Sequence, residues 1–281
     1  MIQYTQESTS KFVQTKDWKL HYNDAGEGEV VLMVHGSGPG ATGWANFHRN
    51  VDPLVAAGYR VILMDCPGFG RSSSSVSDEP RFDLTGRAIG QLMDALDIDQ
   101  AHMIGNSMGG GSVLAYARHH QRRVGKMVLM GAAGVGPYSV FTPVPMEGIG
   151  LLMKLYAEPS MENLRNMLDV FVYDSSKLTE ELITLRHEAI LANPHHLENF
   201  LESHKLAKGV MGDYSADLAN IPNPTLITWG RDDRFVPVDW GLKMLQLMPD
   251  SRLHVFSQCG HWAQWEHADA FNRMVVDFLQ H

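Results

Sequence analysis

Short apolar runs that are each followed by a turn signal and a helical pattern constrain the fold of this 281-residue chain most. The runs occupy residues 30–35, 60–65, 101–106, 126–131, 225–229 and 252–256. Helical periodicity follows at about 83–97, 108–120, 239–248 and 266–279. Continuously apolar strands that alternate with helices are typical of a mostly parallel sheet with helices on both faces. We therefore predict an α/β fold, with residues 18–23 as an early antiparallel strand.

The alternation stops between about Gly134 and Asn223, where only helical patterns occur. These patterns lie near 146–157, 160–172, 178–192 and 195–207. An insertion at the carboxyl ends of parallel strands lies where α/β sheets bind ligands. We therefore predict a core formed by residues 1–134 and 223–281, and a helical lid formed by residues 135–222.

Charge and cysteine content exclude several classes of protein. The net charge of −9 argues against general nucleic-acid binding, and an anionic substrate then needs a local cation. Two cysteines form neither a disulfide framework nor a Cys-rich metal site, so we expect no metal and a cytoplasmic location. Residues 1–24 lack the pattern of a signal peptide. Residues 127–146 carry no charge, but glycines and prolines interrupt them, so we expect no membrane span.

The pentapeptide Gly105-Asn106-Ser107-Met108-Gly109 matches G-x-S-x-G between a predicted strand and a predicted helix. This is the setting of a nucleophile elbow, in which a serine occupies a strained turn. Small residues at both ends let the strand and the helix approach closely. The helix directs its first N–H groups at the site, so that of Met108 can stabilise an oxyanion. We therefore predict Ser107 as a nucleophile.

A serine hydroxyl needs a paired base near neutral pH, and candidate partners follow two later strands. Asp232 and Asp233 come after the strand at 225–229, and His261 comes after the strand at 252–256. The order Ser, Asp, His is that of α/β-hydrolases. We predict His261 as the base and Asp233 as the acid that fixes its tautomer, because Asp233 has the G-x-x-D spacing.

The segment HGSGPGA at 35–41 allows two interpretations. It contains G-x-G-x-x-A, which is also a dinucleotide-binding pattern. Against a dinucleotide site, Pro39 lies among the glycines, and residues 42–44 are not typical of the start of a tight helix carrying a pyrophosphate. The hydrolytic interpretation uses the exposed backbone N–H groups of this loop: that of Ser37 would join that of Met108 in an oxyanion hole.

Five segments carry a resemblance to a known family. They are HGSGPGATGWANF at 35–47, DCPGFGRS at 65–72, GNSMGG at 105–110, WGRDDRFVP at 229–237 and CGHWAQWEHADAFN at 259–272. With them the chain resembles, over nearly its whole length, the meta-cleavage-product hydrolases, which cut a carbon–carbon bond in ring-opened aromatics. The resemblance implies the α/β-hydrolase fold, no cofactor, and a homodimer or higher homo-oligomer.

The resemblance also assigns roles to residues. Ser107, Asp233 and His261 match the family's triad, and Ser37 and Met108 match its oxyanion-hole positions. Arg186 matches the arginine that holds the carboxylate end of an anionic dienoate, a role suited to a bidentate guanidinium. Further matches to substrate-binding positions are Gly38, Asn46, Asn106, Phe171 and Trp262. Ordinary alternatives are turn hydrogen bonding for the asparagines, core packing for the aromatic residues and an exposed helix position for Arg186.

The implied reaction cleaves the C5–C6 bond of a 2-hydroxy-6-oxo-2,4-dienoate. The nearest likeness is to hydrolases of 2-hydroxy-6-oxonona-2,4-dienedioate, whose products are 2-hydroxypenta-2,4-dienoate and succinate. A biphenyl-type dienoate, a plain ester substrate, a nicotinamide-dependent activity and a non-catalytic receptor are the alternatives. The sequence identifies no cation for a distal carboxylate, and it leaves open whether Ser107 or a water attacks the C6 ketone.

Overall fold

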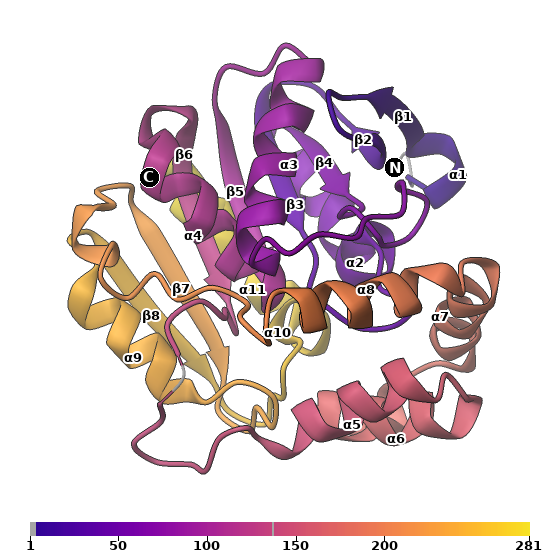
Figure 1. The fold of residues 1–281 in the computed structure, drawn as a ribbon. Coiled ribbons are helices and arrows are strands. Elements are labelled where there is room, and N and C mark those ends of the chain that lie inside the picture. Colours follow the sequence, from indigo (N-terminus) through magenta and orange to yellow (C-terminus); the bar gives the residue numbers. More distant parts are fainter. Residues whose placement is uncertain (1–3, 137) are drawn as a thin grey trace.

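The computed structural model describes residues 4–136 and 138–281, so residues 1–3 of the predicted core and Pro137 of the predicted insertion lie outside the described residues. Helices cover both faces of an eight-stranded sheet (Figure 1). The strands are β1 (Ser10–Gln14), β2 (Lys19–Ala25), β3 (Glu29–Val34), β4 (Tyr59–Met64), β5 (Ala101–Asn106), β6 (Val124–Met130), β7 (Thr225–Gly230) and β8 (Ser251–Phe256). The helices are α1 (Gln6–Thr9), α2 (Gly43–Ala56), α3 (Arg81–Ala95), α4 (Met108–His120), α5 (Glu147–Ala157), α6 (Met161–Phe171), α7 (Glu180–Ala192), α8 (His195–Leu206), α9 (Val238–Leu247), α10 (Ala263–Glu266) and α11 (Ala268–Gln280).

The strand order is β1-β2-β4-β3-β5-β6-β7-β8. β2 is antiparallel to its neighbours β1 and β4, and the strands from β4 to β8 are mutually parallel. The predicted α/β fold and the antiparallel early strand are therefore confirmed. The sequence reasoning missed β1 because this edge strand is short and mostly exposed, without the apolar run that marks the central strands.

The pleat of the central strands divides the interior between two hydrophobic cores. Along β3, Leu32 and Val34 enter the core beneath α3 and α4, whereas Val31 and Met33 enter the core beneath α2 and α11. Side chains of successive strand residues point to opposite faces, so a strand buried on both sides is apolar throughout. This explains why the apolar runs predicted the central strands to within about two residues.

One expectation from the sequence is wrong. Residues 42–44 do begin a helix, because α2 starts at Gly43 with Thr42 as its N-cap. The Thr42 hydroxyl accepts a hydrogen bond from the Ala45 N–H at 3.0 Å, which satisfies one of the free donors of the first turn. The glycines before Thr42 obscured this cap in the sequence.

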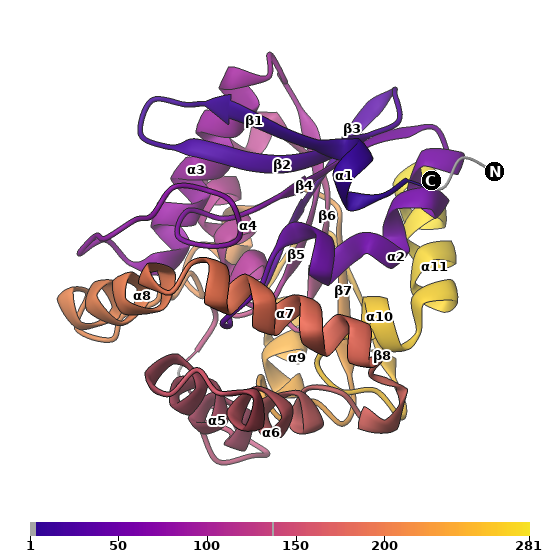
Figure 2. The ribbon, with the colours of Figure 1, turned by 90° about the vertical axis from the view of Figure 1, so that its right-hand side faces the viewer.

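Helices α5 to α8 lie across one end of the sheet (Figures 1 and 2). It is the end at which the parallel strands finish, since Gly38, just after β3, lies between α5 and α7. A Cβ added at Gly38 would be 3.3 Å from Leu152 of α5 and 3.2 Å from Arg186 of α7. Among the described residues, no helix has both the length and the apolar character needed to cross a bilayer.

Candidate active site

The turn between β5 and α4 holds Ser107 in a conformation that L-residues rarely adopt, with φ 54° and ψ −116°. Backbone hydrogen bonds hold this turn. The Ser107 N–H donates to the Met130 carbonyl at 2.9 Å, and its own carbonyl accepts from Gly111 at 3.1 Å and Ala133 at 3.0 Å. A strained serine kept in place by neighbouring structure is what a nucleophile elbow requires.

Gly109 allows the close approach that this turn needs. A Cβ at this position would collide with the carbonyl oxygen of Val34, at the end of β3. Helix α4 therefore starts directly against β3, and the loop at 35–41 passes next to Ser107. A Cβ added at Gly36 of this loop would lie 3.2 Å from the Ser107 Cβ.

His261 and Asp233 form a buried pair. His261 Nδ1 lies 2.7 Å from Asp233 Oδ2, and each side chain is 1% exposed. The other carboxylate oxygen, Oδ1, accepts from the N–H groups of Phe235 at 2.7 Å and Val236 at 3.0 Å. These contacts fix the carboxylate and leave His261 Nε2 as the ring nitrogen available to a reacting group.

Asp232, the competing acid, points elsewhere. It accepts from the Cys259 N–H at 3.3 Å and forms an ion pair with its neighbour Arg231. Among the described residues, no hydrogen bond joins Ser107 to His261.

Arg186 is a buried cation without an acidic partner in the described part of the chain. Its residue is 1% exposed, and its one hydrogen bond goes to the Pro39 carbonyl at 3.3 Å. Burial lowers the pKa of its guanidinium to about 10, which leaves it charged at neutral pH. The guanidinium carbon lies 5.3 Å from the Trp262 ring centre. The expected alternative of an exposed helix arginine is therefore wrong.

Four of the residues predicted to bind substrate each contain a buried polar atom without a hydrogen-bond partner among the described residues. These atoms are Asn46 Nδ2, Asn106 Oδ1, Arg186 Nε and Trp262 Nε1. Unpaired buried polar groups are costly, which is why most of them find a partner. Other residues have such atoms too, so they indicate a ligand site only together with the unpaired charge of Arg186.

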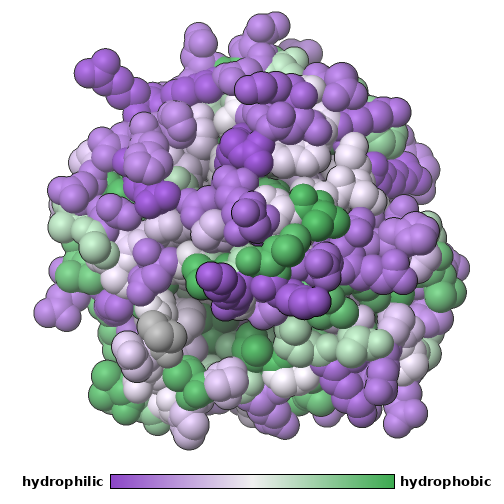
Figure 3. Space-filling view, in the orientation of Figure 1, coloured by the Kyte–Doolittle hydropathy of each residue, from purple (hydrophilic) through white to green (hydrophobic). Residues whose placement is uncertain are grey.

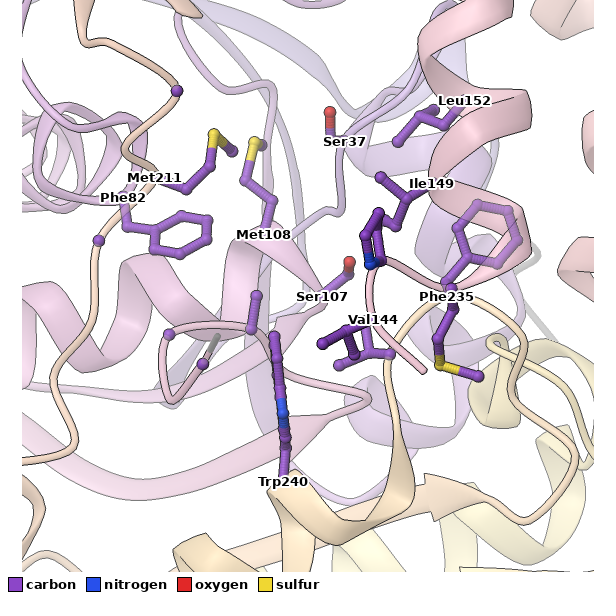
Figure 4. Close-up of a pocket in the computed structure, with 18 of the residues that line it drawn as sticks. Ser37, Phe82, Ser107, Met108, Val144, Ile149, Leu152, Met211, Phe235 and Trp240 are labelled. Atoms are coloured by element: carbon purple, nitrogen blue, oxygen red, sulfur yellow. The ribbon is translucent and has the colours of Figure 1, made fainter. Parts of the chain in front are cut away.

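A cavity of about 660 Å³ lies beside the serine turn. Ser37, Ser107 and Met108 line it, and Figure 4 shows both serine hydroxyls facing the open space. The other walls are mainly apolar, with Phe82, Val144, Ile149, Leu152, Met211, Phe235 and Trp240 among them. Among the described residues that line the cavity, only His204 and Asp213 can carry a charge. In the space-filling view, which has the orientation of Figure 1, apolar residues border a hollow in the surface (Figure 3).

The remaining predicted residues, Arg186 among them, do not line this cavity, and some of them contact residues that do. Phe171 contacts the cavity residue Phe235, with ring centres 4.6 Å apart, and it also contacts the rings of His261 at 5.0 Å and Trp262 at 4.7 Å. Trp262 in turn lies against Arg186. Asn106 donates to Met130 O at 3.2 Å, and Asn46 lies in α2, where no hydrogen bond joins its side chain to the described residues. The structure thus brings most of the set around one site, with Asn46 the least connected.

Sequence reasoning missed Tyr156. Its hydroxyl lies 2.8 Å from Ser37 Oγ and accepts from the Gly38 N–H at 3.1 Å. No local pattern distinguishes this tyrosine from a core residue of α5, because its partners are more than a hundred residues away in the sequence.

Two observations concern the binding of a dinucleotide or a metal. Gly38 has φ +127° and lies against Arg186 of α7 and Leu152 of α5, so these two side chains occupy the space beside the loop. Among residues 4–136 and 138–281, no group of three or more His, Cys, Asp or Glu side chains could hold a metal ion.

Comparison with known proteins is consistent with this geometry. Residues 29–268 match the family described as alpha/beta hydrolase fold. A 2-hydroxy-6-oxo-6-phenylhexa-2,4-dienoate hydrolase from Comamonas testosteroni is 56% identical, over 100% of this chain and 99% of the relative. A 2-hydroxy-6-oxononadienedioate/2-hydroxy-6-oxononatrienedioate hydrolase from Paraburkholderia xenovorans (strain LB400) is 55% identical, over 99% of this chain and 97% of the relative.

A solved structure of a meta-cleavage product hydrolase from Pseudomonas fluorescens IP01, complexed with acetates, has a TM-score of 0.86 and 37% sequence identity. The match covers 96% of this chain and 97% of that structure.

Proposed function

Because the chain belongs to the α/β-hydrolase fold family and, within it, to the meta-cleavage-product hydrolases, we propose that it hydrolyses the C5–C6 bond of a 2-hydroxy-6-oxo-2,4-dienoate. The expected compound is 2-hydroxy-6-oxonona-2,4-dienedioate, which yields 2-hydroxypenta-2,4-dienoate and succinate in the breakdown of phenylpropionate and cinnamate. Relatives named for this dienedioate support that choice.

The observation that carries the proposal is the buried charge of Arg186. A fully buried guanidinium without an acidic partner among the described residues is costly, and an anionic substrate supplies the missing charge. Carboxylates bind guanidinium groups in a bidentate manner, so the substrate's C1 carboxylate is the group we assign to Arg186. Asn46, Asn106, Phe171, Trp262 and Gly38 complete the substrate-binding set in this proposal. A plain ester needs no such cation.

In the proposed mechanism, His261 first moves the proton of the 2-hydroxyl group to C5, which converts the dienol into a ketone. Water, or the Ser107 hydroxyl, then attacks the C6 ketone while His261 accepts the proton. Asp233 stabilises the imidazolium, and the N–H groups of Ser37 and Met108 stabilise the oxyanion. When the C5–C6 bond breaks, its electron pair passes into the conjugated 2-oxo system, and the resulting enolate takes a proton from His261 to give 2-hydroxypenta-2,4-dienoate. If water attacked, the C6 fragment leaves directly as a carboxylic acid. If Ser107 attacked, the fragment stays on the serine as an ester, which a water molecule then hydrolyses to the acid.

A second candidate substrate is the 6-phenyl dienoate, which one specific observation favours. The cavity beside Ser107 is walled mainly by apolar side chains, and no lysine or arginine for a distal carboxylate is among the described residues that line it. An apolar wall favours an uncharged tail through burial of apolar surface. The Comamonas testosteroni relative named for the phenyl compound agrees with this candidate.

The proposal also gives a role to helices α5 to α8, which lie across the end of the sheet. We propose that residues 135–222 form a lid on a core of residues 1–134 and 223–281. The lid residues Leu152 and Arg186, which lie next to Gly38, support this division. Closing a site with a lid excludes water and strengthens the electrostatic interactions inside it.

Cellular location and assembly are further parts of the proposal. We assign the enzyme to the cytoplasm, in agreement with its two free cysteines, Cys66 and Cys259. From the family resemblance we expect a homodimer or higher homo-oligomer, a state that light scattering after size-exclusion chromatography measures directly.

The experiment mixes the purified protein with the yellow ring-fission product of 2,3-dihydroxyphenylpropionate and follows its visible absorbance. We expect rapid bleaching with release of succinate, and loss of bleaching in Ser107→Ala. Slow bleaching with fast turnover of the phenyl analogue selects the second candidate. Turnover of simple esters without bleaching of either dienoate refutes the proposal, and so does binding without turnover.

A further inference from the structure

The hydroxyl of Tyr156 ties a helix of the proposed lid to the loop beside the serine turn. Tyr156 lies on α5, is 3% exposed, and stacks on Phe200 of α8 with ring centres 4.2 Å apart and 6° between the ring planes. Its oxygen accepts from the Gly38 N–H at 3.1 Å and lies 2.8 Å from Ser37 Oγ. One phenol therefore contacts two consecutive residues of the loop.

The donors and acceptors around the Tyr156 hydroxyl indicate the direction of its hydrogen bond with Ser37. The backbone N–H of Gly38 can only donate, so the Tyr156 oxygen accepts there. If the Ser37 hydroxyl also donated to Tyr156, the buried phenolic proton would have no acceptor in the described part of the chain. The favoured arrangement therefore has Tyr156 donating to Ser37 Oγ, which leaves the Ser37 proton free to point elsewhere.

The cavity lies where the Ser37 proton can point. Ser37 is partly exposed and lines the cavity together with Ser107, and Figure 4 shows both hydroxyls on its walls. Burial raises the pKa of Tyr156 to about 12, so the phenol keeps its proton at neutral pH and remains a donor.

The same helix also forms part of the cavity wall. Ile149, Leu152 and Met153 of α5 line the cavity, as does Phe200, on which the Tyr156 ring is stacked. The position of α5 therefore determines both the shape of the wall and the place of the Tyr156 hydroxyl. A loop held by this hydroxyl keeps its geometry only while α5 is docked.

We propose that Tyr156 is a positioning residue that holds the loop at Ser37 and Gly38, so that the Ser37 N–H faces the oxyanion and the Ser37 hydroxyl donates into the cavity. This inference rests on the proposed function, because it assigns Ser37 to the oxyanion hole. Tyr156 acts through the loop and does not touch the reacting atoms. Oxyanion donors act through preorganised geometry, so a loosened loop slows turnover more than it weakens substrate binding.

The first test compares Tyr156→Phe, Ser37→Ala and the double variant in dienoate hydrolysis. We expect Tyr156→Phe to lower kcat about 10-fold while KM stays within about 3-fold. Because Tyr156 acts through Ser37 and Gly38, the loss in the double variant should be smaller than the product of the two single losses. The matched control is Tyr116→Phe, since Tyr116 is also buried and its hydroxyl has no partner among the described residues. It should keep its kcat.

Two outcomes of this test overturn the proposal. One is a pair of single losses that multiply in the double variant, which means that the residues act independently. The other is a lower melting temperature for Tyr156→Phe with unchanged kcat, which means that the hydroxyl serves stability alone.

The second test does not depend on dienoate turnover. Phenylboronic acid forms a tetrahedral adduct with an active serine and places a boron-bound oxygen in the oxyanion hole. We expect Tyr156→Phe to raise its Kd about 10-fold, and Ser107→Ala to abolish binding. If the wild type bleaches no dienoate but the Kd rises as expected, the proposed function fails and the role of Tyr156 stands. An unchanged Kd, or a wild type that binds no boronate, overturns the role of Tyr156.

Discussion

Replacing Arg186 with methionine should change activity and stability in opposite directions. A drop in the pKa of this guanidinium from 12.5 to about 10 corresponds to about 3 kcal/mol against the buried charge. The loss of the 3.3 Å hydrogen bond to Pro39 and of the contact with the Trp262 ring offsets about 2 kcal/mol of that. We therefore expect Arg186→Met to raise the free energy of unfolding by about 1 kcal/mol.

Activity should fall steeply in the same variant. A bidentate, charge-assisted contact with a carboxylate contributes about 3–4 kcal/mol, so kcat/KM should decrease about 10²- to 10³-fold. Urea denaturation measures the stability, and the bleaching assay measures kcat/KM. Arg81→Met is the matched control, because Arg81 is also buried with its pKa lowered by burial, but its guanidinium donates to the Pro67 carbonyl and lies over the Phe69 ring instead of the Trp262 ring. Its kcat/KM should stay within a few-fold of wild type.

One combination of results contradicts the reasoning. If Arg186→Met unfolds more than 2 kcal/mol more easily and keeps kcat/KM within about fivefold, Arg186 is a structural residue. The assignment of the dienoate carboxylate to this side chain is then wrong.

Three further predictions follow from the geometry. Gly109→Ala should destabilise the fold by about 2–4 kcal/mol, because the new Cβ collides with a carbonyl of β3. Gly150→Ala should stabilise the fold by up to about 1 kcal/mol, because its Cβ enters open space on α5. Urea denaturation measures both changes. Burial lowers the pKa of His35, so as pH falls through about 6.5 the unfolded state gains this proton before the folded state does. The free energy of unfolding should then decrease by up to about 1.4 kcal/mol for each unit by which pH falls. Urea denaturation at pH 7.5 and 5.5 should show a smaller decrease for His35→Gln than for the wild type. Asp233→Asn should lower kcat by about 10³-fold or more, whereas Asp232→Asn should lower it by less than about fivefold. Equal losses in the two variants would contradict the choice of Asp233 as the acid that pairs with His261.

The sequence predicted best the parts of the fold whose signals are local. Strands such as β5 are buried on both faces and are therefore apolar throughout, so the runs located them. Strand β1 lies at an exposed edge and carries no such run. Helix α2 was missed because glycines precede its Thr42 cap.

In the candidate site, too, some residues follow from local sequence signals and others do not. The order of Ser107, Asp233 and His261 along the chain follows from motifs after strands, and their assigned roles remain predictions for the kinetic tests. Tyr156 could not be predicted, because only the tertiary docking of α5 brings it to the loop at Ser37. Recognition of a cavity wall depends on such long-range packing, which residue patterns do not encode.

The cavity wall has an evolutionary consequence. Val144, Pro145, Met146, Ile149, Leu152 and Met153 belong to one short stretch of chain, and Val210 and Met211 belong to another. The serine turn and the histidine–aspartate pair lie on separate segments, at the ends of β5, β7 and β8. These two parts of the cavity wall are thus encoded in other stretches of the gene than the proposed reacting groups. Recombination across residues 144–153 can exchange this part of the wall as a cassette while the proposed reacting groups are inherited unchanged.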